Sequence, residues 1–164
     1  MDRSKRVIFA AHCVLNQNSV VEPLARAKGA YKDIIELIMD KGIGIHQLPC
    51  PEFRFLGLGR PPMSKEEYDT PEFRELCKVL AADSVKIIEV YSNSGYEIVG
   101  ILGIHQSPTC SITGLQGVFM EELIPILESK GISINIFEVP EDYYDGDRGV
   151  DFIEFLADQI SKED

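Results

Sequence analysis

The chain has 164 residues, which is enough for one compact domain with a buried core and too few to favour two. Hydrophobic residues make up 45% of it and charged residues 26%, which is ordinary for a globular protein. The formal net charge of −11 disfavours a broad nucleic-acid-binding surface and disfavours attraction to an anionic membrane. We therefore expect neither a nucleic acid nor a membrane as a partner.

Two features of the sequence bear on its location. No apolar run reaches the roughly 18 residues of a membrane-spanning helix, so none is expected. The apolar stretch at 7–11 is too short for the core of a signal peptide. We therefore expect a cytoplasmic protein whose four cysteines stay reduced, instead of a secreted protein with two disulfides.

The first part of the chain alternates apolar runs with polar and helical segments. Residues 7–11 predict a strand, and the polar segment 15–29 predicts a loop. Apolar residues recur at helical spacing over 30–41, where a helix is expected. A short strand is expected at 43–48. The segment 49–62, rich in Pro, Gly and Arg, is predicted to be an ordered loop without regular structure.

The middle of the chain repeats this alternation. A helix is expected over 70–92, because Thr-Pro-Glu at its start combines a capping side chain with a proline in the first turn. The apolar run 96–105 predicts a central strand that is buried on both faces. An ordered loop at 107–117 leads into a helix over 118–130, which Pro125 should kink or shift at its start.

The last part of the chain contains a predicted strand at 132–139, an acidic and aromatic loop at 140–149 and a closing amphipathic helix at 150–161. Strands that alternate with helices indicate a parallel sheet with helices on its faces. We therefore predict an α/β fold for residues 1–164. It would be a single-domain, Rossmann-like three-layer sandwich with a mostly parallel sheet of about four strands.

Three cysteines follow three of the predicted strands. They are Cys13, Cys50 and Cys110, and loops leaving the carboxyl ends of parallel strands gather along one edge of the sheet. Thiols far apart in the sequence should therefore meet, which predicts a three-cysteine metal or iron–sulfur site. The alternative is that they are small buried hydrophobic residues, as we expect for Cys77 in the middle of a helix.

The kind of centre stays open at this point. Thiolates are soft ligands that favour zinc, copper(I) or iron–sulfur clusters, but the paired spacings of zinc knuckles and ferredoxins are absent. The histidines His12, His46 and His105 each precede one of the three cysteines, so a mixed Cys and His zinc site is an alternative. A nucleophilic cysteine with a histidine base is another, although it explains one cysteine of the three.

Polar side chains beside the cysteines are candidates for proton transfer. Glu52 lies two residues after the second cysteine and could act as a general acid or base. It could equally pair with Arg54 or Arg60 and hold its loop in place. Ser107 and Thr109 flank a proline just before the third cysteine, where they could bind substrate or close the turn.

Taken together, the cysteine segments resemble those of the 2-thiouracil desulfurase family. That family combines an early Cys-Leu-x-Gly-like strand end with a Cys-Pro-Glu loop and a Ser-Pro-Ser-Cys loop. The corresponding segments here are Cys13-Val14-Leu15-Asn16, Cys50-Pro51-Glu52 and Ser107-Pro108-Thr109-Cys110. The step Arg60-Pro61-Pro62 and the helix start Gly117-Val118 are also similar to the family, over roughly residues 5–140.

The resemblance implies a [4Fe–4S] cluster held by Cys13, Cys50 and Cys110, with the fourth iron open to the sulfur of a substrate. It implies a desulfidase in which water attacks the activated carbon and sulfide leaves. Glu52 and Ser107 are then the candidates for proton transfer and substrate orientation.

The chain departs from the family pattern around the expected pocket, at His12, at 16–21 and at Thr109-Cys110-Ser111. We therefore expect a small thiolated compound, such as a thionucleobase, in place of thiouracil itself. Two alternatives come from other classes. One is a zinc- or cluster-binding protein without catalysis, acting as a sensor or sulfur carrier. The other is a nucleotide-binding module of the same fold whose cysteines only pack.

Overall fold

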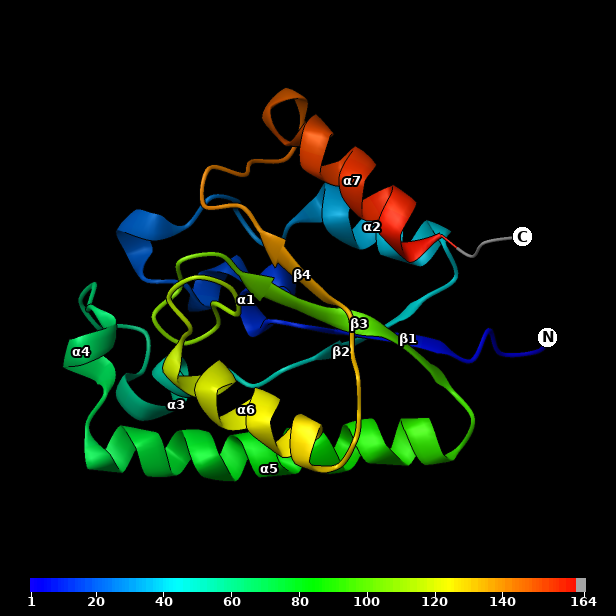
Figure 1. Cartoon of the computed structure of the whole chain (residues 1–164). Coiled ribbons are helices and arrows are strands. Elements are labelled where there is room, and N and C mark those ends of the chain that lie inside the picture. The colour runs from blue at the N-terminus through cyan, green and yellow to red at the C-terminus, as the bar shows by residue number, and fades with distance from the viewer. Residues whose placement is uncertain (162–164) are drawn as a thin grey trace.

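The computed structural model describes residues 1–161 and contains one sheet of four parallel strands (Figure 1). The strand order is β2-β1-β3-β4. The strands are β1 (Arg6–Ala10), β2 (Gly44–Gln47), β3 (Glu97–Ile104) and β4 (Ile136–Val139). Each pairs in parallel with its neighbour, as the alternation of strands and helices predicted.

Helices cover both faces of the sheet and make three layers. In Figure 1, α2 (Lys32–Asp40) and α7 (Val150–Ile160) lie on one face and contact each other. On the opposite face, α5 (Pro71–Asn93) packs against α6 (Val118–Ser129). The predicted α/β three-layer sandwich is therefore confirmed.

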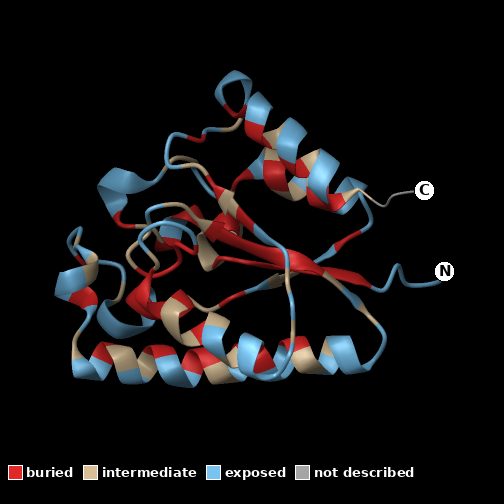
Figure 2. Ribbon diagram, in the orientation of Figure 1, coloured by how far each residue is buried: buried red, intermediate tan, exposed pale blue. Residues whose placement is uncertain are grey.

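The core lies where these layers meet. Every residue of β1 is buried, and the middle of β3 is buried on both faces (Figure 2). Continuous burial explains why these strands read as unbroken apolar runs. Helix α5 is capped by Thr70, whose side chain accepts a hydrogen bond from the backbone of Phe73. Cys77 lies on its inner face and is fully buried, so its assignment to the core is confirmed.

The segment 49–62 differs from its prediction, because it contains the helix α3 (Pro51–Leu56). Proline at the first helical position and a capping side chain at Cys50 offset the loop-forming Gly and Pro residues around it. The short helix α4 (Lys65–Tyr68) follows, and a capping box between Ser64 and Glu67 caps its N-terminus.

The predicted loop at 15–29 also contains helical turns. Helix α1 (His12–Leu15) follows β1 at once, and the 3₁₀ turns η1 (Gln17–Ser19) and η2 (Glu22–Leu24) come next. A third 3₁₀ turn, η3 (Asp147–Gly149), precedes α7. Turns this short depend on contacts with the rest of the fold, which a local pattern does not contain.

Two other elements differ from their predictions to different extents. Helix α6 begins at Val118 as predicted and continues through Pro125, and β4 begins at Ile136, four residues later than expected. No helix in residues 1–161 is both long enough and apolar enough to span a bilayer.

Candidate functional site

A cavity of about 440 Å³ lies at the edge of the sheet where β1, β2 and β3 end. Side chains from segments far apart in the sequence line it, including Cys13, Cys50 and Cys110. Glu52 and Ser107 line the same cavity. The structure therefore brings all five candidate residues to one place.

Cys13 lies in the first turn of α1, directly after β1. The backbone N–H of Ala11 donates to the carbonyl of Leu102 in β3 at 2.8 Å, so the start of this turn is tied to the central strand. The side-chain amide of Gln17 donates to the carbonyl of Cys13 at 2.8 Å. Gln17 is itself buried, so the position of the first cysteine is fixed from both sides.

Cys50 occupies the N-cap of α3. Its sulfur accepts a hydrogen bond from the backbone N–H of Phe53 at 3.4 Å, which satisfies one of the free N–H groups of the first turn. The short helix therefore places the second thiol at its own N-terminus, facing the cavity.

Cys110 lies in the loop between β3 and α6 and is 8% exposed. The hydroxyl of Ser107 accepts hydrogen bonds from the backbone N–H groups of Cys110 at 3.1 Å and Thr109 at 3.3 Å. A Cβ added at Gly117 would lie 2.2 Å from the carbonyl carbon of Thr109, and one at Gly103 would lie 2.6 Å from the carbonyl oxygen of Cys110. Two glycines thus let this loop pack against the sheet and against α6.

The three thiols share an environment that keeps them protonated in the metal-free chain. Burial raises the pKa of Cys13 to about 12, and the neighbouring Cys50 adds to the shift. Burial also raises the pKa of Cys110 well above its usual range, with Cys50 and Cys13 contributing. The pKa of Cys50 is raised by burial too, although the Phe53 N–H opposes the shift. Desolvation is thus the main cause of the raised pKa of each thiol, and the other site thiols add to it at Cys13 and Cys110.

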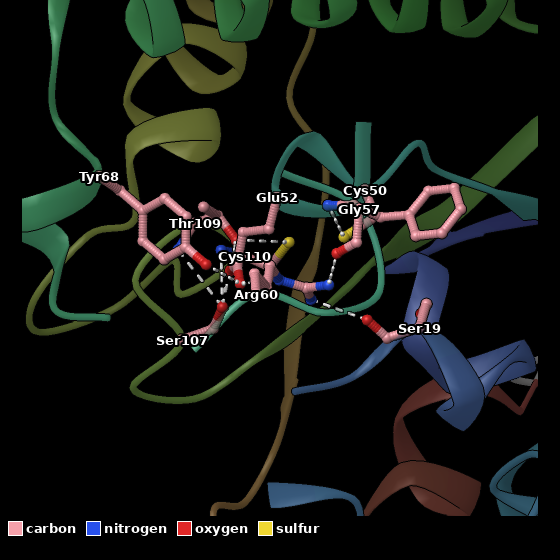
Figure 3. Close-up of polar contacts among 10 residues, drawn as sticks. Ser19, Cys50, Glu52, Gly57, Arg60, Tyr68, Ser107, Thr109 and Cys110 are labelled. Atoms are coloured by element: carbon pink, nitrogen blue, oxygen red, sulfur yellow. Dashed lines mark hydrogen bonds and ion pairs between the residues drawn. The ribbon is translucent and has the colours of Figure 1, made fainter. Parts of the chain in front are cut away.

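Glu52 is buried and connects two loops of the cavity (Figure 3). One of its oxygens, Oε1, accepts from the hydroxyl of Tyr68 at 2.9 Å and from Nε of Arg60 at 3.3 Å. The other, Oε2, accepts from the hydroxyl of Thr109 at 2.7 Å. Arg60 continues to the carbonyl of Ser19 at 2.7 Å. The partner of Glu52 is therefore Arg60, whereas Arg54 is exposed.

Comparison with known proteins bears on this geometry. A family model described as "Putative 2-thiouracil desulfurase" matches residues 6–121, from β1 into α6 and including all three cysteines. The chain belongs to this family. It is also 40% identical over 152 residues to "Uncharacterized protein MJ0003" of Methanocaldococcus jannaschii, covering 93% of this chain and 97% of that protein. No solved structure matches the chain.

The three cysteines of this desulfurase-family chain suit an iron–sulfur cluster by their chemistry. All are free thiols, and soft sulfur donors from separate loops line one cavity. Within residues 1–161, no group of three or more His, Cys, Asp or Glu side chains is arranged to hold a single metal ion.

The histidines occupy different places. His12 and His105 line the cavity, whereas His46 packs on the ring of Phe9 with centroids 5.0 Å apart and does not line it. Nδ1 of His105 lies 3.7 Å from a carboxylate oxygen of Glu138. Burial would raise the pKa of Glu138, but hydrogen bonds from the 112–113 backbone and a threonine hydroxyl hold it below the usual range.

Sequence reasoning missed several residues that line the cavity or support it. Tyr68 was not singled out, although its hydroxyl reaches Glu52, nor were Arg26 and Tyr31, whereas Gln17 lies in the stretch 16–21 that was expected beside the pocket. No local pattern marks them, because their roles depend on contacts between distant segments. The capping box at Ser64 could have revealed α4 and therefore the place of Tyr68.

Proposed function

We propose that this chain is an iron–sulfur-cluster-dependent desulfidase that removes sulfur from a small thiolated compound such as a thionucleobase. The observation that carries the proposal is the convergence of Cys13, Cys50 and Cys110 on one cavity in a chain of the 2-thiouracil desulfurase family. Overall, a C=S group and water would become a C=O group and hydrogen sulfide, with no net change of electrons.

The same three residues would hold a [4Fe–4S] cluster as thiolates. When bound, such a cluster supplies a Lewis-acidic iron to which the sulfur of a thiocarbonyl can bind. Three protein thiolates leave one of the four irons without a protein ligand. The cavity of about 440 Å³ is large enough for a substrate the size of a nucleobase beside the ligands.

Glu52 is our candidate for moving the proton of the attacking water. Its carboxylate lines the cavity and is held in a fixed orientation by Tyr68, Arg60 and Thr109, which is what a general base requires. Ser107 lines the cavity as well, and its oxygen already accepts from two backbone N–H groups. Its hydroxyl also lies 3.4 Å from that of Thr109, which donates to Glu52, so the Ser107 hydrogen is directed to Thr109 and would turn to a bound substrate to orient it.

The size of the cavity favours this enzyme over the non-catalytic alternative. A sensor or a structural zinc site has a closed ligand set and needs no room for a second molecule. Here the cysteines share their cavity with a carboxylate, a serine hydroxyl and two histidines. Zinc or cluster binding without catalysis remains the second hypothesis, and the experiment below separates the two.

The decisive experiment is anaerobic reconstitution with iron and sulfide, followed by metal and sulfide analysis and by turnover of a panel of thiolated bases. We expect about four irons per chain in the wild type. Cys110→Ser should bind far less iron, whereas Cys77→Ser should bind as much as the wild type, because Cys77 lies in the core of α5. Across the wild type and the two variants, the rate of hydrogen sulfide release should rise and fall with the iron content per chain.

Two results would contradict the proposal. Iron uptake that Cys110→Ser does not reduce would separate the cluster from this cavity. Stable binding of one zinc ion per chain, with no hydrogen sulfide from any thiolated base, would instead support the non-catalytic alternative.

A further inference from the structure

Two polar side chains at the carboxyl edge of the sheet, His105 and Glu138, have no role in the chemistry proposed so far. His105 directly follows β3 and lines the cavity, and Glu138 lies in the neighbouring strand β4. Nδ1 of His105 lies 3.7 Å from Oε2 of Glu138. The backbone N–H of His105 donates to the carbonyl of Val139 at 3.0 Å, so the pairing of the two strands holds the imidazole next to the carboxylate.

Glu138 is a fixed anion, and its side chain is 9% exposed. Its carboxylate accepts hydrogen bonds from the backbone N–H groups of Ile112 at 3.0 Å and Thr113 at 3.1 Å, and from the hydroxyl of Thr113. Burial would raise the pKa of Glu138, but these hydrogen bonds and the neighbouring His105 hold it below the usual range. An ionised carboxylate beside an imidazole stabilises the protonated form of the ring.

Gln106 indicates which ring nitrogen of His105 carries the hydrogen in the neutral state. The side-chain nitrogen of Gln106 lies 3.4 Å from Nε2 of the ring, and an amide nitrogen only donates. The contacts on both sides of the ring are therefore satisfied together when Nε2 accepts and the hydrogen lies on Nδ1, on the side of Glu138. This leaves Nε2 as the nitrogen that gains and loses a proton.

Ser111 connects the turn after His105 to the carboxylate. Its oxygen accepts from the backbone N–H of Gln106 at 3.1 Å, and its hydrogen is shared between Glu138 at 3.3 Å and the carbonyl of Thr113 at 3.2 Å. Gln106 has a φ of 63°, which is unfavourable for a residue with a side chain, so its backbone depends on such contacts. The chain departs from the family pattern at Ser111, and the family match ends at residue 121, so it gives no role to Glu138.

His105 differs from His12, the other histidine that lines the cavity. The ring of His12 stacks on that of Phe53, with the centroids 6.4 Å apart. Among residues 1–161, His12 forms no ion pair with a carboxylate. His105 is therefore the histidine of the cavity with an anionic partner, and such a partner fixes the ring and the proton that it carries.

We infer that His105, oriented by Glu138, is the catalytic acid that gives a proton to the leaving sulfur. This inference rests on the proposed function, because it supplies the second proton transfer of that reaction. Glu52 takes one proton of the attacking water as the water oxygen bonds to the carbon. The C–S bond breaks with its electron pair on sulfur, which takes the proton of the His105 imidazolium and leaves as hydrosulfide. The second water proton restores the imidazolium as the C=O group forms, and Glu52 passes its proton to the solvent, so no electrons are gained or lost.

The positioning role of Glu138 can be tested on the full metal-free chain by ¹⁵N NMR of the histidine rings, with neither iron nor substrate present. In the neutral state, the His105 ring of the wild type should carry its hydrogen on Nδ1. Glu138→Gln removes the charge that faces this nitrogen, and the ring should then be a mixture of its two neutral forms. His105→Ala assigns the signal, because it removes it from the spectrum.

The catalytic role can be tested on reconstituted protein. His105→Ala should bind as much iron as the wild type but release hydrogen sulfide about 100-fold more slowly per cluster, as expected for loss of a general acid. Imidazole in solution should restore part of this rate and should not raise the rate of Glu52→Gln. His46→Gln is the matched control, since His46 packs on Phe9 and does not line the cavity, and its rate should equal that of the wild type. If thermal unfolding shows that His105→Ala does not fold, the rate of His105→Gln decides.

The outcomes distinguish this inference from the proposed function. A wild-type ring with its hydrogen on Nε2, or one that Glu138→Gln does not change, would overturn the pairing of His105 with Glu138. Unchanged hydrogen sulfide release per cluster in His105→Ala, or a loss that imidazole does not restore, would overturn the catalytic role of His105 and leave the desulfidase standing. No hydrogen sulfide from the reconstituted wild type would contradict the desulfidase and the acid together, and the metal-free chain would still decide the pairing.

Discussion

Glu52 illustrates how one residue can serve both the structure and the chemistry of a site. Its carboxylate joins α3, which carries Cys50, to the loop that carries Cys110, through the hydroxyl of Thr109. It also neutralises Arg60, which is 7% exposed and would otherwise be a buried unpaired charge. The sequence left open whether Glu52 holds the loop or moves a proton. The contacts show that Glu52 holds the loop. Its role in proton transfer belongs to the proposed function.

Removing the charge of Glu52 should therefore affect stability and turnover separately. We expect Glu52→Gln to lower the free energy of unfolding of the metal-free chain by about 3 kcal/mol, because it leaves Arg60 without a counterion in a buried setting. Urea denaturation under anaerobic, reducing conditions would measure this. In reconstituted protein, hydrogen sulfide release per bound cluster should fall by about 100-fold or more, as expected for loss of a general base.

A double-mutant cycle provides the control. Arg60→Met combined with Glu52→Gln should cost less stability than the sum of the two single changes, because each single change leaves its partner unpaired. If the stability costs of the two single changes add up in the double variant, Glu52 and Arg60 are not energetically coupled. Unchanged turnover per cluster in Glu52→Gln would remove Glu52 from the mechanism.

At the scale of elements, the loop from 107 to 117 depends on close contact with α6. Gly117 precedes this helix, and no side chain fits there because the carbonyl of Thr109 occupies the space of a Cβ. Gly117→Ala should force the Cys110 loop outward and cost about 2 kcal/mol or more, which thermal unfolding would detect. Gly117→Ala should also take up less iron on reconstitution than the wild type.

Gly59→Ala is the matched control for this prediction. Gly59 also lies in a loop beside the cavity residue Arg60, but an added Cβ there would meet nothing within 4 Å. We expect its unfolding temperature and iron content to match those of the wild type. Equal behaviour of the two alanine variants would show that close packing at Gly117 does not position Cys110.

The main elements could be predicted from the sequence because their signals are local. The middle of β3 is buried on both faces and apolar. Helix α5 has its capping residue, its first-turn proline and its buried apolar stripe within one stretch of chain. The short helices α1 and α3 were missed, since turns of four to six residues are stabilised by contacts that lie elsewhere in the fold.

The difference between local signals and contacts across the fold also decides which residues of the site could be predicted. The three cysteines could be expected to meet because each follows a strand of one parallel sheet, which is a topological argument. Arg26 could not be found in this way. Its side chain is held by the carbonyls of Pro140 and Tyr143, more than 100 residues away, and nothing in the residues around it indicates that contact.

At the scale of the whole molecule, desolvation of the three site thiols gives the metal-free chain a weakness at alkaline pH. The pKa of Cys13 rises from 9.0 to about 12, and those of Cys50 and Cys110 are raised in the same direction. A raised pKa means that the folded state favours the neutral thiol. The stability that this contributes is fully present below about pH 9 and is lost as the pH rises towards the folded pKa.

We therefore expect the reduced, metal-free chain to lose up to about 1 kcal/mol of unfolding free energy per site thiol for each pH unit above pH 9. Urea denaturation at about pH 8 and about pH 10 would measure the loss. A variant with serine at 13, 50 and 110 should lose much less over the same interval. Cys77, whose pKa is also raised to about 12, is present in both proteins and cancels in the comparison.

The buried tyrosines do not obscure this window. Burial raises the pKa of Tyr31 from 10.0 to about 12, and those of Tyr68 and Tyr143 are raised further, so their contribution is lost only above about pH 10. If the serine variant loses as much stability as the wild type between pH 8 and 10, the thiols are not desolvated together. The shared cavity on which the proposed cluster site depends would then be wrong.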